Sequence, residues 1–243
     1  MSKNDIYEYS SMTCMVILDK LTTVPEMQKN SLLEVNNINF FYNKRKDIIK
    51  NLNFKLFPSE IVGISGENGA GKSTFLKLLV GILKPRKGNI IKNGILGYSP
   101  QNILLFDNLT VLENFRVFGK GLNLSQTTIE EKTSEILDIL QFKQYKDTFV
   151  KDLSGGTAQK TNFGISLLGD PDILVLDEPY QGLDYSSFTA FWEIQFKLRK
   201  LGKSIIIVSH LIEDQSKFTR SLHLINKKLQ SCDKQNCSLG CEN

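Results

Sequence analysis

Short apolar runs separated by polar and glycine-containing breaks are the dominant pattern of this chain from residue 32 onward. Runs rich in Ile, Val, Leu and Phe that end at Asn, Gly, Pro or Ser are typical of strands and their turns. The pattern predicts strands at residues 33–41, 53–56, 61–65, 95–99, 173–176, 204–209 and 222–225. Asn93 and Gly94, between two such runs, predict a tight turn.

Helical periodicity separates many of these strands. It predicts helices at residues 72–83, 156–168 and 186–200, and a longer helical stretch at about residues 110–152. In that stretch Thr128 and Glu131 have the spacing of a capping box. One helical face carries Ile129, Ile136, Leu137 and Leu140. Because alternating strands and helices form mostly parallel sheets covered on both faces, we predict an α/β fold with a helical lobe inserted at about residues 102–158.

Composition narrows the class of protein without indicating an activity. The 243 residues are 41% hydrophobic and 23% charged, as in folded globular proteins and unlike disordered or disulfide-dense chains. The net charge of +4 is a mild excess that could suit an anionic ligand or a membrane surface but requires neither. No apolar run reaches the roughly 18–20 residues of a membrane-spanning helix. Asp5 and Glu8 argue against a secretory signal, so we expect a cytoplasmic protein.

The two ends of the chain differ from its middle. Residues 1–30 lack a steady period and are interpreted as an N-terminal extension. Residues 230–243 carry Cys232, Cys237 and Cys241, which lack the paired spacing and the fourth ligand of a zinc site. We interpret this segment as an exposed tail, with metal binding and lipidation as the alternatives. Residues 31–229 are assigned to one folded domain.

The segment between the strand at 61–65 and the helix at 72–83 matches the pattern G-x-x-x-x-G-K-[ST] of phosphate-binding loops. Its residues are Gly66, Glu67, Asn68, Gly69, Ala70, Gly71, Lys72 and Ser73, followed by Thr74. The glycines let successive backbone N–H groups face phosphate oxygens at the positive end of the following helix. Lys72 is expected to reach the β- and γ-phosphates of a nucleotide, and the Ser73 hydroxyl to bind Mg²⁺. A purely structural glycine turn is the alternative.

Two adjacent acids, Asp177 and Glu178, end an apolar strand. That position lies at the sheet edge where ligands of open α/β folds bind. We assign Asp177 to Mg²⁺ and Glu178 to the attacking water. Alone, the pair would be an ordinary exposed strand end, but beside the Lys72 loop it predicts nucleotide hydrolysis.

Between these two motifs lies the tetrapeptide Leu153-Ser154-Gly155-Gly156. With it, the chain resembles the ATP-binding subunit of ABC transporters over residues 32–229. The resemblance implies a P-loop NTPase fold with a RecA-like, mostly parallel core, an antiparallel β portion and a helical lobe. It also implies that Ser154, Gly155 and Gly156 face the ATP of a second subunit in a head-to-tail dimer. Small residues with unpaired N–H groups at a helix start suit an anion, although an ordinary N-cap is the alternative.

Further positions match the family one by one. Tyr42 or the adjacent Phe41 is expected to stack on adenine, with core packing as the alternative for either ring. Gln101 matches the residue that joins the core to the helical lobe and senses Mg²⁺ and water. Asp184 matches the acid of the loop that crosses the dimer interface, and His210 matches the histidine near the γ-phosphate. Gln101 and Asp184 could instead be plain loop or turn residues, and His210 a structural one.

A few positions fall outside the family pattern. His223 matches none of its functional positions and is interpreted as a packing or surface residue. Thr157 replaces the Gln of many members, and Tyr180 follows Pro179 where Thr or Ser is frequent. Neither removes a phosphate or metal ligand, so the prediction of hydrolysis stands. Residues 157–160 resemble those of separately encoded subunits of exporter type.

The resulting prediction is an ATP-binding subunit that hydrolyses ATP to drive transport through a separate transmembrane permease. Its cofactors are ATP and Mg²⁺, with Ser73, Gln101 and Asp177 as the metal site and Glu178, His210 and Gln101 as the catalytic group. We expect a second, identical subunit, no nucleic acid, and a cytoplasmic position at the inner face of the membrane through the permease. The alternatives are a soluble ABC ATPase that serves an assembly or repair machine, and an ATP-switched binding subunit with little turnover.

Overall fold

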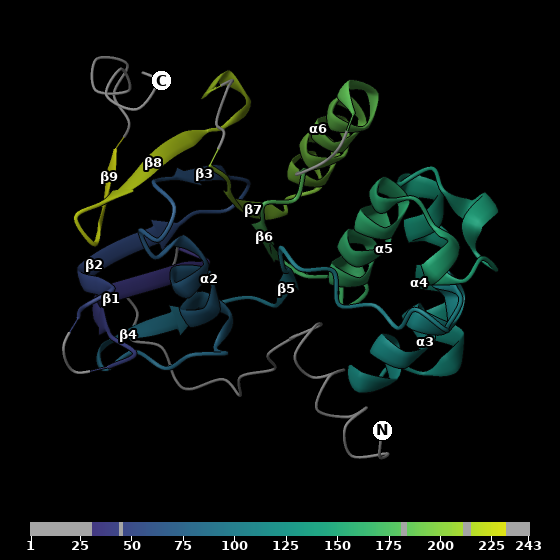
Figure 1. Cartoon of the computed structure of the whole chain (residues 1–243), viewed down its shortest axis with the longest axis horizontal. Helices are drawn as coiled ribbons and strands as arrows, with labels where there is room; N and C mark the ends of the chain where they lie inside the picture. Colours follow the sequence, from purple (N-terminus) through teal and green to yellow (C-terminus); the bar gives the residue numbers. More distant parts are fainter. Residues whose placement is uncertain (1–30, 44–45, 181–183, 211–214, 232–243) are drawn as a thin grey trace.

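The computed structural model of the chain describes residues 31–43, 46–180, 184–210 and 215–231. The predicted extension at residues 1–30 and the cysteines of the C-terminal tail lie outside these ranges. The predicted α/β architecture is confirmed, with two sheets and a group of helices to one side of them (Figure 1).

The larger sheet has six strands, of which five are parallel. In spatial order they are β5 (Leu96–Ser99), β6 (Ile173–Asp177), β7 (Ser204–Val208), β3 (Ile61–Ser65), β8 (Arg220–Ile225) and β9 (Lys228–Ser231). Only β9, at the edge, runs antiparallel to its neighbour. The central strands β6 and β7 are buried along their whole length, which explains their unbroken apolar sequences. Because these strands are parallel, the loops after β3, β5, β6 and β7 meet at one edge of the sheet.

The smaller sheet is antiparallel, in the order β2 (Ile49–Leu56), β1 (Leu33–Phe40) and β4 (Lys87–Lys92). In β2 buried and exposed residues mostly alternate, because one face packs on the core and the other meets solvent. The strand predicted at residues 53–56 omits the first four residues of β2, where two consecutive exposed residues interrupt the alternation. The pattern did not predict β4 or β9, since both are edge strands with few buried side chains.

The tight turn predicted at Asn93 and Gly94 does not connect two paired strands, so it is not a hairpin turn. The strands on either side of it, β4 and β5, belong to different sheets. An added Cβ at Gly94 would lie 2.9 Å from Cβ of Asp172, so the glycine lets the crossing segment pass close to the start of β6.

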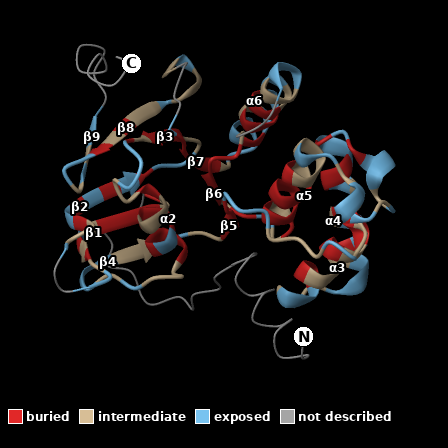
Figure 2. Cartoon of the chain, viewed as in Figure 1, coloured by how far each residue is buried: buried red, intermediate tan, exposed pale blue. Residues whose placement is uncertain are grey.

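Two hydrophobic cores cover the two faces of the larger sheet (Figure 2). Val175 and Ile206 face the first core, which also contains the antiparallel sheet and α2 (Lys72–Val80). Leu174 and Ile207 face the second, which contains α5 (Gly155–Leu167) and α6 (Tyr185–Lys200). The period-two alternation of strand side chains thus divides each central strand between both cores. The predicted helix at residues 72–83 ends earlier, because Gly81 adopts a left-handed cap with φ 88°.

The helical lobe contains α3 (Val111–Gly121), α4 (Gln126–Ile139) and two short turns, η1 (Lys143–Tyr145) and η2 (Val150–Asp152). The predicted capping box at Thr128 is wrong, because Ser125 caps α4 and accepts from the Thr128 N–H at 3.1 Å. A capping box does occur at the start of α3, where Thr110 and Glu113 bond each other's backbone N–H. In the described part of the chain, no helix combines the length and apolar character that crossing a membrane requires.

Candidate functional site

A cleft of about 550 Å³ opens at the edge of the larger sheet where β3, β5, β6 and β7 end. Most of the polar residues that line it were predicted from the sequence. The cleft is lined by Tyr42, Ile48, Asn68, Gly69, Gly71, Lys72, Ser73, Thr74, Gln101, Glu178 and His210. Five separate segments of the chain therefore meet at one place.

The loop between β3 and α2 adopts a conformation that depends on its glycines. Gly66, Gly69 and Gly71 have φ of 152°, 81° and 106°, in the region that side chains disfavour. A Cβ at Gly66 would lie 2.9 Å from the Leu224 carbonyl oxygen, so strand β8 leaves no room for one. The loop thus curves tightly into the N-terminus of α2, where unpaired N–H groups favour an anion.

Lys72 is folded back under this loop. Its Nζ donates to the carbonyl oxygens of Gly66, at 2.6 Å, and Glu67, at 3.1 Å. Burial lowers the pKa of the Lys72 ammonium, while the nearby Glu178 and Asp177 carboxylates oppose this effect. Within the described residues the buried ammonium is hydrogen-bonded to neutral carbonyls alone, so it suits an incoming phosphate.

Asp177 is buried, and its Oδ1 has no hydrogen-bond partner among the described residues. Burial raises the pKa of Asp177 to about 6, and the neighbouring Glu178 carboxylate contributes, while a hydrogen bond with Ser73 opposes the shift. A buried carboxylate beside a serine hydroxyl is the kind of oxygen site that Mg²⁺ uses together with phosphate oxygens. No cluster of three His, Cys, Asp or Glu occurs in the described ranges.

Glu178 is held in a single orientation at the back of the cleft. Its carboxylate accepts from the His210 backbone N–H at 2.8 Å and the Ser209 hydroxyl at 3.0 Å, and its Oε2 lies 3.0 Å from His210 Nδ1. Its own N–H donates to the Val208 carbonyl at 2.8 Å, and its φ of 48° is unusual for a residue other than glycine. The strained backbone directs the carboxylate from the end of β6 toward the end of β7.

The predicted signature residues do not line this cleft. Ser154 caps α5 and accepts from the Thr157 N–H at 3.2 Å, and both Ser154 and Gly155 are exposed. Gly156 lies in the first turn of the same helix. Asp184 likewise caps α6, accepting from the Ser187 N–H at 2.7 Å, and this bond leads the causes that lower the pKa of Asp184. The neighbouring Gly182 and Leu183 lie outside the described residues.

Helix α5 nevertheless contacts two of the loops that lead to the cleft. Asn162 donates to the Ser99 hydroxyl at 3.1 Å and the Pro100 carbonyl at 3.2 Å, directly before Gln101. Gln159 donates to the Pro179 carbonyl at 3.3 Å, directly after Glu178. The helix that begins at Gly155 is therefore hydrogen-bonded to the loop before Gln101 and to the loop after Glu178.

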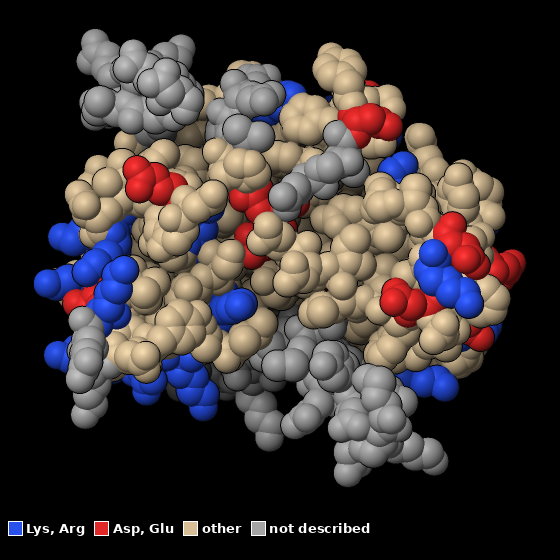
Figure 3. Space-filling view, in the orientation of Figure 1, with Lys and Arg blue, Asp and Glu red and all other residues tan. Residues whose placement is uncertain are grey.

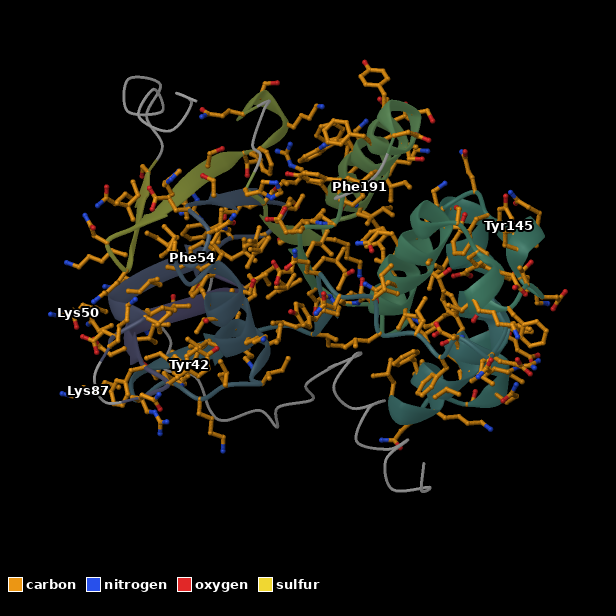
Figure 4. The ribbon with its side chains drawn as sticks, in the orientation of Figure 1. Tyr42, Lys50, Phe54, Lys87, Tyr145 and Phe191 are labelled. Atoms are coloured by element: carbon orange, nitrogen blue, oxygen red, sulfur yellow. The ribbon has the colours of Figure 1, made fainter. Side chains whose placement is uncertain are left out.

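The two candidate aromatic residues, Tyr42 and Phe41, have different surroundings. Tyr42 lines the cleft and is 53% exposed, with its hydroxyl 3.2 Å from that of Thr74. Figure 4 shows Tyr42 on the side of the antiparallel sheet, far from Phe191 on α6. The Phe41 ring instead faces the Arg86 guanidinium, with 5.4 Å from Cζ to the ring centroid.

Sequence reasoning missed two residues of the site. Ile48 lines the cleft, yet it is an apolar residue before β2 with no local signal of function. Ser209 bonds Glu178, and its place beside His210 could have suggested it. Of the phosphate-loop residues, Gly66, Glu67 and Ala70 do not line the cleft; Gly66 and Glu67 supply carbonyls to Lys72, and Ala70 packs against the first core. His223 contacts Ser65, with 2.7 Å between Nδ1 and Oγ, so it packs as predicted.

Comparisons with known proteins agree with this geometry. The family model for ABC transporters matches residues 49–181. An uncharacterized ABC transporter ATP-binding protein of Methanocaldococcus jannaschii is 33% identical over 181 residues, 74% of this chain and 69% of the relative. The Nod factor export ATP-binding protein I of Cupriavidus metallidurans is 32% identical over 208 residues, 81% of this chain and 68% of the relative.

Solved structures share the fold. The cbiO1 protein of Clostridium perfringens, described as part of the ABC transporter complex cbiONQ, superposes with a TM-score of 0.74 at 24% identity, over 83% of this chain and 88% of that one. A bacterial ABC transporter cassette solved as a dimer has a TM-score of 0.72 at 23% identity, over 82% and 96%. With the phosphate loop, the acid pair and the signature helix in place, the chain belongs to the ABC transporter family, as one of its ATP-binding, ATP-hydrolysing subunits.

Proposed function

We propose that this subunit hydrolyses ATP between two copies of itself and thereby drives transport through a separate membrane permease. The observation that carries the proposal is the meeting of Lys72, Ser73, Glu178 and His210 in one cleft. The phosphate loop supplies an anion site, and the loops after β6 and β7 place an acid and a histidine beside it.

Binding of ATP follows from the shape and charge of this cleft. The adenine stacks on Tyr42, an interaction worth about 0.5–1.5 kcal/mol. The backbone N–H groups of residues 66–74 and the ammonium of Lys72 hold the phosphates, which replace its carbonyl partners. Ser73 and Asp177, with Gln101, hold Mg²⁺, which when bound neutralises phosphate charge.

Glu178 and His210 act on the attacking water. A glutamate that holds this water in line with the terminal phosphate can accept its proton as the bond from the water oxygen to the γ-phosphorus forms. The bond from the γ-phosphorus to the β–γ bridging oxygen breaks, and ADP leaves with that oxygen. The contact to His210 orients the Glu178 carboxylate. His210 lines the same cleft as Lys72 and Ser73, which favours its assignment to the γ-phosphate. The Ser209 hydroxyl adds a second restraint on the same carboxylate.

The position of the signature helix supports a head-to-tail dimer. Ser154 and Gly155 are exposed and are absent from the cleft of their own chain. A second subunit could therefore place its α5 N-terminus against the γ-phosphate, as the resemblance implies. Asp184 would lie in the same interface.

The membrane partner is proposed from the family, since subunits of this kind generally pair with a permease. The contacts of Asn162 with Ser99 and Pro100 join the signature helix to the loop of Gln101, which precedes the helical lobe. Changes at the ATP site could pass along this route to a partner at the inner face of the membrane. The likeness to Nod factor export proteins favours export as the direction.

The experiment compares two substitutions that should fail in different ways. Lys72→Ala removes the buried cation, so binding of ATP should be lost. Glu178→Gln keeps the shape of the side chain but cannot accept a proton, so the variant should bind ATP with Mg²⁺, turn over at least about a hundredfold more slowly and accumulate as a dimer. Binding is measured by fluorescent ATP titration and turnover by phosphate release. Equal turnover of Glu178→Gln and the parent chain would contradict the assignment of the base.

A further inference from the structure

A second, smaller cavity lies in the helical lobe, between α3, α4 and the segment after α4. Its volume is about 120 Å³, and none of its lining residues lines the ATP cleft. Apolar Leu112 and Leu137 line it together with the basic side chains of Arg116, Lys143 and Lys146. Figure 4 shows Tyr145, which lies between these two lysines in sequence, at the outer edge of the lobe.

The basic side chains of this cavity are unequally paired. Arg116 Nη2 lies 2.8 Å from Glu130 Oε1, and Lys143 Nζ lies 2.9 Å from Asp138 Oδ2. The Lys146 backbone bonds Lys143 and Leu112, but its ammonium has no ion pair or hydrogen bond within the described part of the chain. Figure 3 shows basic and acidic side chains mixed over this lobe. Because Arg116 and Lys143 are each paired with an acid, Lys146 is the cavity-lining cation whose charge is left unbalanced among the described residues.

The acid at the cavity is already engaged. Glu130 Oε1 accepts from Gln126 Nε2 at 2.8 Å and from Arg116 at 2.8 Å. These two hydrogen bonds, with the charges of Arg116 and Lys146, lower the pKa of Glu130. The Glu130 carboxylate is therefore bonded to Arg116 and Gln126, and it forms no direct ion pair with Lys146 among the described residues.

Two hydrogen-bond donors at the cavity lack an acceptor. Arg116 Nε is buried and has no partner among the residues that the structure describes. Buried N–H groups nearly always have one, so this atom calls for an acceptor. The Ser134 hydroxyl also has no hydrogen bond within the described ranges. The adjacent Thr133 hydroxyl, by contrast, donates to the Ile129 carbonyl at 2.6 Å. A cation and two donors thus border one small space.

We propose that this cavity binds a single carboxylate group, between Arg116, Ser134 and Lys146. One unbalanced positive charge matches one negative charge, and the nearby Glu130 disfavours a phosphate, which carries about −1.5 to −2 at neutral pH. The volume is about four times the ~30 Å³ of a liquid water molecule, enough for a carboxylate with one or two methylene groups. The apolar side chains of Leu112 and Leu137 suit those methylenes.

The carboxylate could belong to a small free acid or to an Asp or Glu side chain of a bound protein, and two probes separate these sources. The ¹⁵N-labelled full chain is titrated with sodium acetate, and separately with glutamate whose amino and α-carboxyl groups are blocked, each at constant ionic strength against sodium chloride. The readout is the Arg116 Nε–H signal, identified by its absence in Arg116→Lys. Tighter binding of the blocked glutamate assigns the site to a protein side chain, and tighter binding of acetate assigns it to a free acid.

Substitutions test the geometry of this site. Lys146→Met removes the charge but keeps the length of the side chain, and should weaken binding at least about tenfold. Lys132→Met is the matched control, because Lys132 lies on α4 beside the cavity residues Thr133 and Ser134 but does not line the cavity. Its charge acts on Asp170 instead, so this variant should bind as the parent does. Ser134→Ala, which should weaken binding less, is used if Lys146→Met does not fold.

A saturable shift of the Arg116 signal that depends on Lys146 supports the proposal. A signal that moves no further with either probe than with chloride overturns it. Equal binding by folded Lys146→Met and the parent also overturns it. None of these readouts depends on ATP turnover, so the proposal stands or fails independently of the proposed function.

Discussion

Asp177 and Glu178 are adjacent in sequence, but their carboxylates have different surroundings. Glu178 receives two hydrogen bonds and contacts a histidine, whereas Asp177 has one oxygen without a partner among the described residues. The pKa of Asp177 is raised because its carboxylate is buried and one oxygen has no donor, which disfavours the charged form. At the residue scale, the pair therefore separates into one carboxylate fixed by hydrogen bonds, which suits the proposed base, and one with an unsatisfied oxygen, which suits the proposed metal ligand.

This difference predicts the effect of removing the Asp177 charge. Asp177→Asn should raise the free energy of unfolding of the chain without nucleotide or metal by about 2–3 kcal/mol at pH 7, from a pKa raised from 3.8 to about 6. Because the folded state holds the proton more tightly, the parent loses stability as the pH rises from about 4 to 6. The gap between variant and parent should thus be near zero at pH 4 and largest above pH 6, as measured by urea unfolding.

Asp170→Asn is the control for that experiment. Asp170 is exposed, and the hydrogen bond from Lys203 lowers its pKa. Its charge stabilises the folded state above its usual pKa, so this substitution should lower stability slightly at pH 7, the opposite sign. A less stable Asp177→Asn at pH 7 would contradict the account of Asp177.

At the scale of helices and strands, caps decide where the lobe helices begin. The first turn of α3 is fixed by the reciprocal bonds of Thr110 and Glu113, at 3.2 and 2.8 Å. The Thr110 backbone bond also lowers the pKa of Glu113. Helix α3 lines the second cavity through Leu112 and Arg116, so its start positions that site too.

Loss of this cap should destabilise the chain. Thr110→Ala leaves the Glu113 N–H without its acceptor and should lower the free energy of unfolding by about 1 kcal/mol in chemical denaturation. Glu113→Gln is the matched control, because glutamine can still accept from the Thr110 N–H and should cost less. Equal losses in both variants would indicate that the charge of Glu113, and not the paired geometry, stabilises this helix start.

For the whole molecule, the main question is how two copies meet. An added Cβ at Gly155 would contact nothing within 4 Å in its own chain, and the residue is exposed. Its identity therefore has no explanation within one subunit. A small residue there would let the helix N-terminus approach a phosphate held by a partner.

Gly155→Asp tests this explanation. The variant should fold and bind ATP as the parent does, because the position is open and an acid in the first turn of a helix is favourable. It should lose the ATP-dependent dimer, since its carboxylate would face the γ-phosphate of the partner's ATP. Analytical ultracentrifugation in the Glu178→Gln background measures this, with Gly155→Ala as the smaller substitution. A dimer that persists in Glu178→Gln/Gly155→Asp would contradict the head-to-tail arrangement.

The accuracy of the sequence-based predictions depended on where each element lies. Strands β3, β6 and β7 were predicted within one residue, because buried parallel strands are continuous apolar runs. The edge strands β4 and β9 were missed, since their pairing comes from neighbouring strands and not from their own sequences. The cap of α4 was placed three residues late, because Thr128 and Glu131 have the same spacing that a true capping box requires.

For the site residues too, the accuracy of prediction depended on whether their contacts are local in sequence. Contiguous motifs such as residues 66–73 and the acid pair were recognisable from residue type and spacing alone, because backbone N–H groups and strand ends act locally. Other features depend on segments far apart in sequence. These are the ring that lines the cleft, the contribution of Ile48, the lack of a partner for Asp177 Oδ1 among the described residues, and the hydrogen bonds of Asn162 to the loop before Gln101. Such contacts follow from the packing of sheets and helices, which brings distant residues within hydrogen-bonding distance and removes them from water. Local pattern thus predicted the chemistry, and packing set the orientation and charge of the groups that perform it.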